Sequence, residues 1–275
     1  MSRLEWDKVG EHYYETGCDQ GVIYPLTGTT YDKGEAWNGL TTVTQSPSGA
    51  EPTALWADNI KYLNIMSAEE FGGTFECYTY PDAFKECNGE KTVAPGLTIG
   101  QQNRKSFGFA YRSIKGNDTM SNAYGYKLNL IYNCLASPSE KSYATVNDSP
   151  EAGTFSFEFK TTPVNVTGSK PTSILVVESD KADPTKLATL ESILYGSDGT
   201  VSYNEFTGSA FEEDVTYYER TGTVGSYVYT PTQDTSYNDQ KTYYVKVITG
   251  ATDPRLPLPD EVISILGESA NPGQG

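Results

Sequence analysis

The sequence predicts a mainly β protein: an antiparallel β-sandwich or partly closed barrel with one flanking α-helix and a small β insertion. Apolar and polar residues alternate with period two over several segments, which is typical of strands that bury one face. The 275 residues include 21 Tyr and 26 Gly, a composition that favours strands and tight turns. Only one segment carries a strong helical stripe, so helices are expected to play a minor part.

Four segments are the clearest strand candidates. Aromatic residues occupy every second position in 107–111 and in 155–159, with small or polar residues between them. The same alternation runs through 124–134, which places Cys134 on the face that carries the tyrosines of that segment. Residues 174–177 are apolar at every position, and this pattern predicts a central strand covered on both faces.

One helix has start, stop and packing signals. Asp183 can cap its first turn and Pro184 suits the first helical position, while Gly196 supplies a stop. The apolar stripe consists of Leu187, Leu190, Ile193 and Leu194. This stripe is expected to pack on a sheet. A shorter helix is expected at 81–87 on weaker signals.

Two polar stretches divide the chain. Residues 27–53 are rich in Thr, Gly, Ser and Pro and are expected to form a long loop that packs on another subunit. Residues 201–250 read as three or four short strands, too few for a large independent core, and are expected to be an inserted β decoration. The main domain then comprises residues 1–200 and 251–275.

Composition excludes several partners. The formal net charge is −16 and the sequence pI is about 4.4, so the chain is expected to repel DNA rather than to bind its phosphates. The segment from Met1 to Asp7 lacks the apolar stretch of a signal peptide, and no run is long enough to span a bilayer. No membrane partner is therefore expected, and the thiols are expected to be reduced in the cytoplasm.

Catalytic and metal-binding patterns are missing from the sequence. His12 is the single histidine, no two of the four cysteines have C-x-x-C spacing, and neither a nucleophile elbow nor a nucleotide-binding glycine motif occurs. The acidic runs Glu69–Glu70 and Glu212–Asp214 read as solvated charge. We therefore expect no catalytic residue, no cofactor and no metal, and the chain is expected not to be an enzyme.

Several strings carry a resemblance to a known family. They are Trp6–Gly17, Gly21–Pro25, Ala36–Leu40, Glu51–Asn59, Ile99–Arg104, Ala136–Lys141, Thr145–Pro150 and Pro254–Val262. In this combination the chain resembles the major tail proteins, or tail-tube proteins, of long, non-contractile-tailed phages and prophages of Gram-positive bacteria. The resemblance covers residues 5–199 and 250–266, and residues 201–250 depart from it.

The resemblance implies a structural protein of the virion. Subunits of this family assemble into rings, typically six-fold, which stack into a tail tube that conducts DNA during ejection. It implies copies of the chain itself as partners, together with tape-measure, tail-tip and tail-terminator proteins, and DNA that passes without specific binding. It implies localisation in the virion tail, and in the host cytoplasm during assembly.

Within this hypothesis, two sets of residues are candidates for a role. Contacts within or between rings are expected from Trp6, Tyr31, Trp37, Leu40 and Trp56. Glu76 and Glu158 are candidates for the wall of the lumen, where carboxylates would repel phosphates. Two other classes stay open on the sequence: another virion structural or decoration protein, and a carbohydrate-binding β-domain with an exposed aromatic platform.

Overall fold

The computed structural model describes residues 4–143, 145, 148 and 152–267. It is mainly β, with 46% of residues in strands and 10% in helices, and it contains a large antiparallel sheet but no closed barrel. The chain divides into two compact units. The first runs to Tyr195 and resumes at Pro254, and the second spans Gly196–Asp253, which contains the predicted insertion 201–250.

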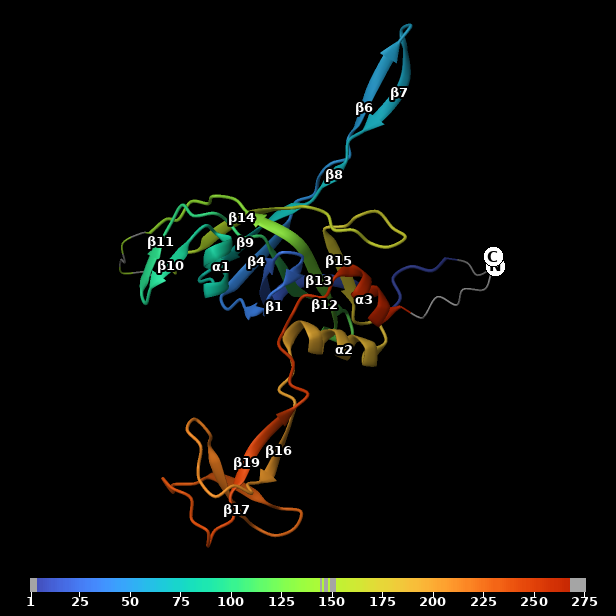
Figure 1. Ribbon diagram of the computed structural model, residues 1–275. Coiled ribbons are helices and arrows are strands. Elements are labelled where there is room, and N and C mark those ends of the chain that lie inside the picture. The colour runs from blue at the N-terminus through green and yellow to red at the C-terminus, as the bar shows by residue number, and fades with distance from the viewer. Residues whose placement is uncertain (1–3, 144, 146–147, 149–151, 268–275) are drawn as a thin grey trace. The chain divides into compact units, whose positions relative to one another are not determined.

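The first unit is built on one antiparallel sheet of nine strands (Figure 1). Its main path runs β2 (Thr30–Tyr31), β1 (Tyr13–Thr27), β12 (Phe107–Asn117), β13 (Ser121–Ala136), β14 (Phe155–Thr161), β9 (Gly72–Cys77) and β4 (Leu40–Gln45). Off this path, β3 (Glu35–Ala36) pairs with β1, and β15 (Ile174–Glu178) pairs with β13. The sheet curls until β4 lies against β1, where the Cys18 thiol lies 3.5 Å from the carbonyl oxygen of Thr41.

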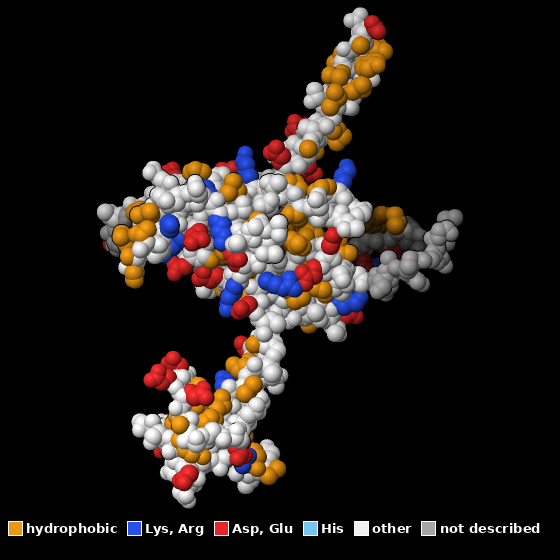
Figure 2. Space-filling view, in the orientation of Figure 1, with side chains coloured by type: hydrophobic (Ala, Val, Ile, Leu, Met, Phe, Trp, Pro, Cys, Tyr) orange, Lys and Arg blue, Asp and Glu red, His pale blue; other side chains and the backbone are white. Residues whose placement is uncertain are grey.

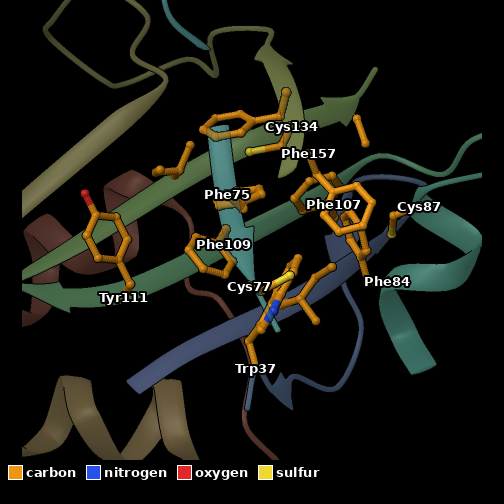
Figure 3. Packing of buried hydrophobic residues seen from close by; sticks show 14 residues of the cluster. Trp37, Phe75, Cys77, Phe84, Cys87, Phe107, Phe109, Tyr111, Cys134 and Phe157 are labelled. Carbon is orange, nitrogen blue, oxygen red and sulfur yellow. The ribbon is translucent and has the colours of Figure 1, made fainter. Parts of the chain in front are cut away.

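An aromatic core fills the inside of this curl (Figure 3). Its fully or almost fully buried rings are Trp37, Phe75, Phe84, Phe107, Phe109, Phe157 and Phe159. Gly73 lies on the same inward face of β9 as Phe75, and a Cβ there would lie 2.8 Å from the ring of Phe159. The helix α1 (Asp82–Cys87) contributes Phe84 and Cys87 to this core, and it matches the short helix expected at 81–87.

A second core separates the sheet from two helices. It joins Leu128, Leu130 and Tyr132 of β13 to α2 (Pro184–Tyr195) and α3 (Pro259–Leu266). The prediction for α2 is confirmed, because its leucines at 187, 190 and 194 are buried and the Asp183 carboxylate accepts hydrogen bonds from two first-turn N–H groups. The helix α3 is not among the predicted elements, and it buries Val262 against the same core.

Two face assignments made from the sequence are wrong. Cys134 lies in the aromatic core while Leu130 and Tyr132 lie in the second core, because the β12–β13 register shifts near Asn133, a residue with φ of +48°. β15 is an edge strand rather than a central one, since among the described strands it pairs with β13 alone and leaves Val176 45% exposed.

The stretch 27–53 is also more ordered than a long loop. It contains β2, β3, β4, β5 (Ser48–Gly49) and the start of β6 (Pro52–Ala57). The strands β4, β5 and β6 form one long ribbon with β7 (Ile60–Met66), β8 (Glu69–Glu70) and β9, in which β4 pairs with β9, β5 with β8, and β6 with β7. A separate short hairpin joins β10 (Lys91–Ala94) to β11 (Leu97–Ile99).

The second unit contains a four-stranded antiparallel sheet of its own. The order is β16 (Thr200–Glu205), β19 (Tyr244–Thr249), β17 (Tyr217–Thr221) and β18 (Val228–Pro231). These are the short strands that the sequence predicts for the insertion. One face of this sheet packs on its own aromatic cluster, formed by Phe206, Phe211, Tyr217, Tyr237 and Tyr243.

Candidate assembly surfaces

The distal hairpin β6–β7 exposes large apolar side chains along both of its strands (Figure 2). They are Leu55, Trp56, Ile60, Tyr62, Leu63, Ile65 and Met66, each at least 41% exposed. None of these residues belongs to either core of the first unit. An isolated two-stranded hairpin is marginally stable in water, and exposed apolar surface of this kind is typical of a binding site.

One face of the hairpin is formed by apolar side chains of both strands. Leu55 lies directly opposite Leu63, and Ile65 lies two residues further along β7. Because side chains alternate between the faces of a strand, these three residues share one face. Asn64 points to the opposite face, which it shares with Tyr62 and Met66, so both faces of the hairpin carry exposed apolar side chains.

The outward face of β4, β9 and β14 is polar. Phe75 pairs with Phe157, which turns both rings inward, so Glu76 and its partner Ser156 point outward. Glu158 and its partner Thr74 lie on this same outward face. Both acidic residues singled out from the sequence therefore share one surface, and within the described residues no helix packs on it.

The part of the sheet formed by β1, β12, β13 and β15 is open at two edges. The first half of β1, from Tyr13 to Gln20, pairs with β12 on one side, and within the described residues no strand pairs with its other side. β15 forms the opposite edge. Each neighbouring pair in this series is antiparallel, so β1 and β15 run in opposite directions.

The free hydrogen-bonding groups of β15 can be assigned by residue. The Tyr132 N–H donates to Ser173, and the Ser179 N–H donates to Tyr126. Since bonded and non-bonded pairs alternate along an antiparallel ladder, Leu175 and Val177 also direct their N–H groups toward β13. The N–H of Val176 consequently points outward, where it could donate a hydrogen bond to a further strand.

A buried ion-pair network holds the end of β15 to β12. The Lys115 Nζ lies 2.7 Å from an Asp180 carboxylate oxygen and 2.9 Å from a Glu178 oxygen. Hydrogen bonds from Lys181 and Lys115 lower the pKa of Glu178 to about 2, and the bond from Lys115 lowers the pKa of Asp180. Hydrogen bonds to the same two carboxylates raise the pKa of Lys115.

The five contact candidates from the sequence fall into two groups. Trp6 and Trp56 are 74% and 69% exposed, so their rings are available to another molecule. Trp37 is only 4% exposed and packs against Phe75, Phe84 and Phe109, which makes it a core residue.

Tyr31 and Leu40 are partly buried as well. The Tyr31 hydroxyl accepts a hydrogen bond from the N–H of Asn133, and Leu40 packs on the aromatic core. Of the five candidates, therefore, only the two exposed tryptophans lie on an accessible surface.

The single histidine, His12, makes a local contact with a carboxylate. The His12 ring is exposed and lies 3.0 Å from the Asp118 carboxylate, whose hydrogen bond raises the histidine pKa. The same carboxylate accepts the N–H of Gly10, so this contact fastens the segment before β1 to the β12–β13 turn.

The described residues contain no group of three or more metal-ligating side chains, and all four cysteines are free. No described helix is long and apolar enough to cross a membrane. Neither a protein-family model nor a curated protein matches this sequence. The sequence resemblance and the geometry above therefore carry the functional argument.

Proposed function

We propose that this chain is a structural subunit that assembles with copies of itself into stacked rings, forming the tail tube of a long-tailed phage. The observation that carries the proposal is the β6–β7 hairpin. Seven large apolar side chains are exposed on an element that belongs to neither core of its own unit. Burying them against another copy would stabilise both the hairpin and the assembly.

Open sheet edges supply a second contact. A ring requires each copy to present one surface to the copy ahead and a different surface to the copy behind. Because β1 and β15 are antiparallel, rotation about a common axis brings β15 of one copy beside β1 of the next as an antiparallel pair. Such pairing satisfies the outward N–H of Val176 and removes both open edges, as closure does in a barrel.

The layers of the first unit suggest which side faces the lumen. The polar face with Glu76 and Glu158 lies on one side of the aromatic core, and α2 and α3 lie beyond the sheet on the other side. We place the polar face on the lumen, where its carboxylates would repel the phosphates of passing DNA. The second unit is inserted in the sequence between α2 and α3, and we propose that it decorates the tube.

Sedimentation velocity tests this proposal. The purified full-length chain should sediment as very large species at high concentration and dissociate on dilution. Trp56→Asp and Leu63→Asp should shift the population towards a single species of about 30 kDa, the mass of one chain. If the unaltered chain sediments as a monomer across the whole accessible concentration range, the proposal is wrong.

A further inference from the structure

The sheet of the second unit has two chemically different faces. Strand register places Tyr217, Tyr243 and Glu219 on one face. It places Tyr203, Tyr218, Tyr229, Tyr244 and Arg220 on the other. The two faces differ in whether their polar groups find partners within the chain.

The first face is internally satisfied. The Tyr243 hydroxyl donates to Asp234 at 2.5 Å, and the Tyr217 hydroxyl accepts the N–H of Glu212. Lys241 bridges Glu219 and Asp234 at 3.1 and 2.8 Å. These polar groups of the first face therefore have partners within the second unit.

The second face is a tyrosine cluster in which Tyr203, Tyr218 and Tyr229 are partly exposed and Tyr244 is buried. Tyr203 stacks on Tyr229 with ring centroids 4.0 Å apart and an interplanar angle of 2°, and Tyr218 meets the edge of Tyr203 at 5.1 Å. Tyr229 in turn contacts Tyr244 at 5.2 Å. The rings support one another, and the hydroxyls of the three partly exposed tyrosines form no hydrogen bond within the described residues, so they are free to bind a ligand.

Cations border this cluster. The Arg220 guanidinium lies 4.3 Å from the ring centroid of Tyr227 and 4.8 Å from that of Tyr244. Lys246 stands opposite Tyr203 on the neighbouring strand and is exposed. Neither cation forms an ion pair within the described residues, and Glu205 is the one carboxylate that the four strands place on this face. Two cations and one carboxylate therefore lie on this face of the sheet.

We propose that this tyrosine–arginine face binds an acidic polysaccharide. Partly exposed tyrosine rings offer apolar surface to the C–H faces of sugars, and their hydroxyls offer hydrogen bonds to sugar hydroxyls. The planar guanidinium of Arg220, which packs on the rings of Tyr227 and Tyr244, can donate two parallel hydrogen bonds to a carboxylate on the saccharide. The inference is independent of tube assembly, since the face belongs wholly to the second unit.

Calorimetric titration of the full-length chain tests the proposal. The probe is an oligogalacturonate, which carries one carboxylate per sugar ring; a dextran oligomer of equal length and inorganic polyphosphate are the comparison ligands. At about 0.15 M salt, where screening suppresses long-range attraction, saturable binding is expected for the oligogalacturonate alone. Absence of that binding overturns the proposal, and equal binding of dextran or polyphosphate overturns the requirement for a sugar that bears a charge.

Variants locate the site. Arg220→Ala should weaken binding at least tenfold, and Tyr229→Phe, which removes only the hydroxyl, should weaken it several-fold. Lys170→Ala removes an equal charge from an exposed position of the first unit and is the matched control, with affinity expected within twofold of the unaltered chain. Equal affinities for Arg220→Ala and the control, with both variants folded by circular dichroism, would overturn the assignment.

Discussion

Phe75 of β9 stacks on Phe159 of β14, with ring centroids 4.4 Å apart and an interplanar angle of 11°. Alternation along each strand then fixes their neighbours, so that Glu76 and Glu158 point to the opposite, polar side. The buried stack thus determines which acidic residues a tube would present to DNA.

Reversing those two charges should make an assembled tube retain DNA. Glu76→Lys with Glu158→Lys replaces two carboxylates per copy by ammonium groups, which attract phosphates. We expect tubes of this variant to co-sediment with short duplex DNA at low salt and to release it as salt rises. Tubes of the matched control, Glu212→Lys with Glu213→Lys in the second unit, should retain much less; equal retention would contradict the lumen assignment.

A single charge on the hairpin face that carries Leu55, Leu63 and Ile65 should abolish assembly. Leu63→Asp places a carboxylate where we expect a dry contact with another copy, and burying an unpaired charge is costly. The monomer should keep its melting temperature, because Leu63 belongs to neither core. Ser169→Asp adds the same charge at an exposed position of the first unit outside the hairpin and should assemble far better. Light scattering against concentration compares the two variants, and an equal loss of assembly in both would contradict the proposed contact.

Proline at Val176 should block pairing at the β15 edge. Val176→Pro removes an outward N–H but leaves the ladder to β13 intact, whereas Val176→Ala trims the side chain and keeps the N–H. We expect the proline variant to remain folded and unassembled, and the alanine variant to assemble. Electron microscopy of both would decide the matter, and normal rings from the proline variant would show that this edge is not used.

The Lys115 network should make stability depend on pH in the acidic range. The pKa of Glu178 is lowered to about 2, so its contribution is present above its unfolded value of about 4.3 and is lost as the pH falls from about 4 to about 2. Lys115→Met should lower the melting temperature by several degrees at pH 7, because it leaves two carboxylates without their shared cation.

The same substitution should cost much less near pH 2, where both carboxyl groups are becoming neutral. Lys181→Met, at a cation whose side chain is 69% exposed, is the control and should have a small effect throughout. A loss for Lys115→Met that is constant between pH 7 and pH 2 would contradict this account of the network.

Local sequence signals predicted the elements that local chemistry determines. Asp183, Pro184 and Gly196 delimit α2 because capping and turn conformations depend on adjacent residues. The helix α3 was not predicted, although Pro259 at its start and the acidic residues Asp260 and Glu261 in its first turn are local signals of the same kind. The strands at 107–111, 124–134 and 155–159 could be predicted because their large apolar residues recur at every second position, which is the period of a strand.

The burial of a residue and the position of a strand in its sheet depend on residues far away in the sequence, so they could not be predicted from local patterns. Residues 174–177 are apolar whether β15 lies at the centre or at an edge, since Leu175 and Val177 meet the helices while Val176 is exposed. Trp37 sits in a polar stretch, yet the curl of the sheet carries it into the aromatic core. The apolar surface around Trp56 depends on the pairing of β6 with β7, which the sequence pattern did not predict.

The most direct test of the central claim is negative-stain electron microscopy of the purified full-length chain, from dilute solution to its solubility limit. We predict rings and hollow tubes of even width, with a lumen wide enough for a DNA duplex. Dispersed particles of about 30 kDa at every concentration would contradict the claim that this chain is a self-assembling tube subunit.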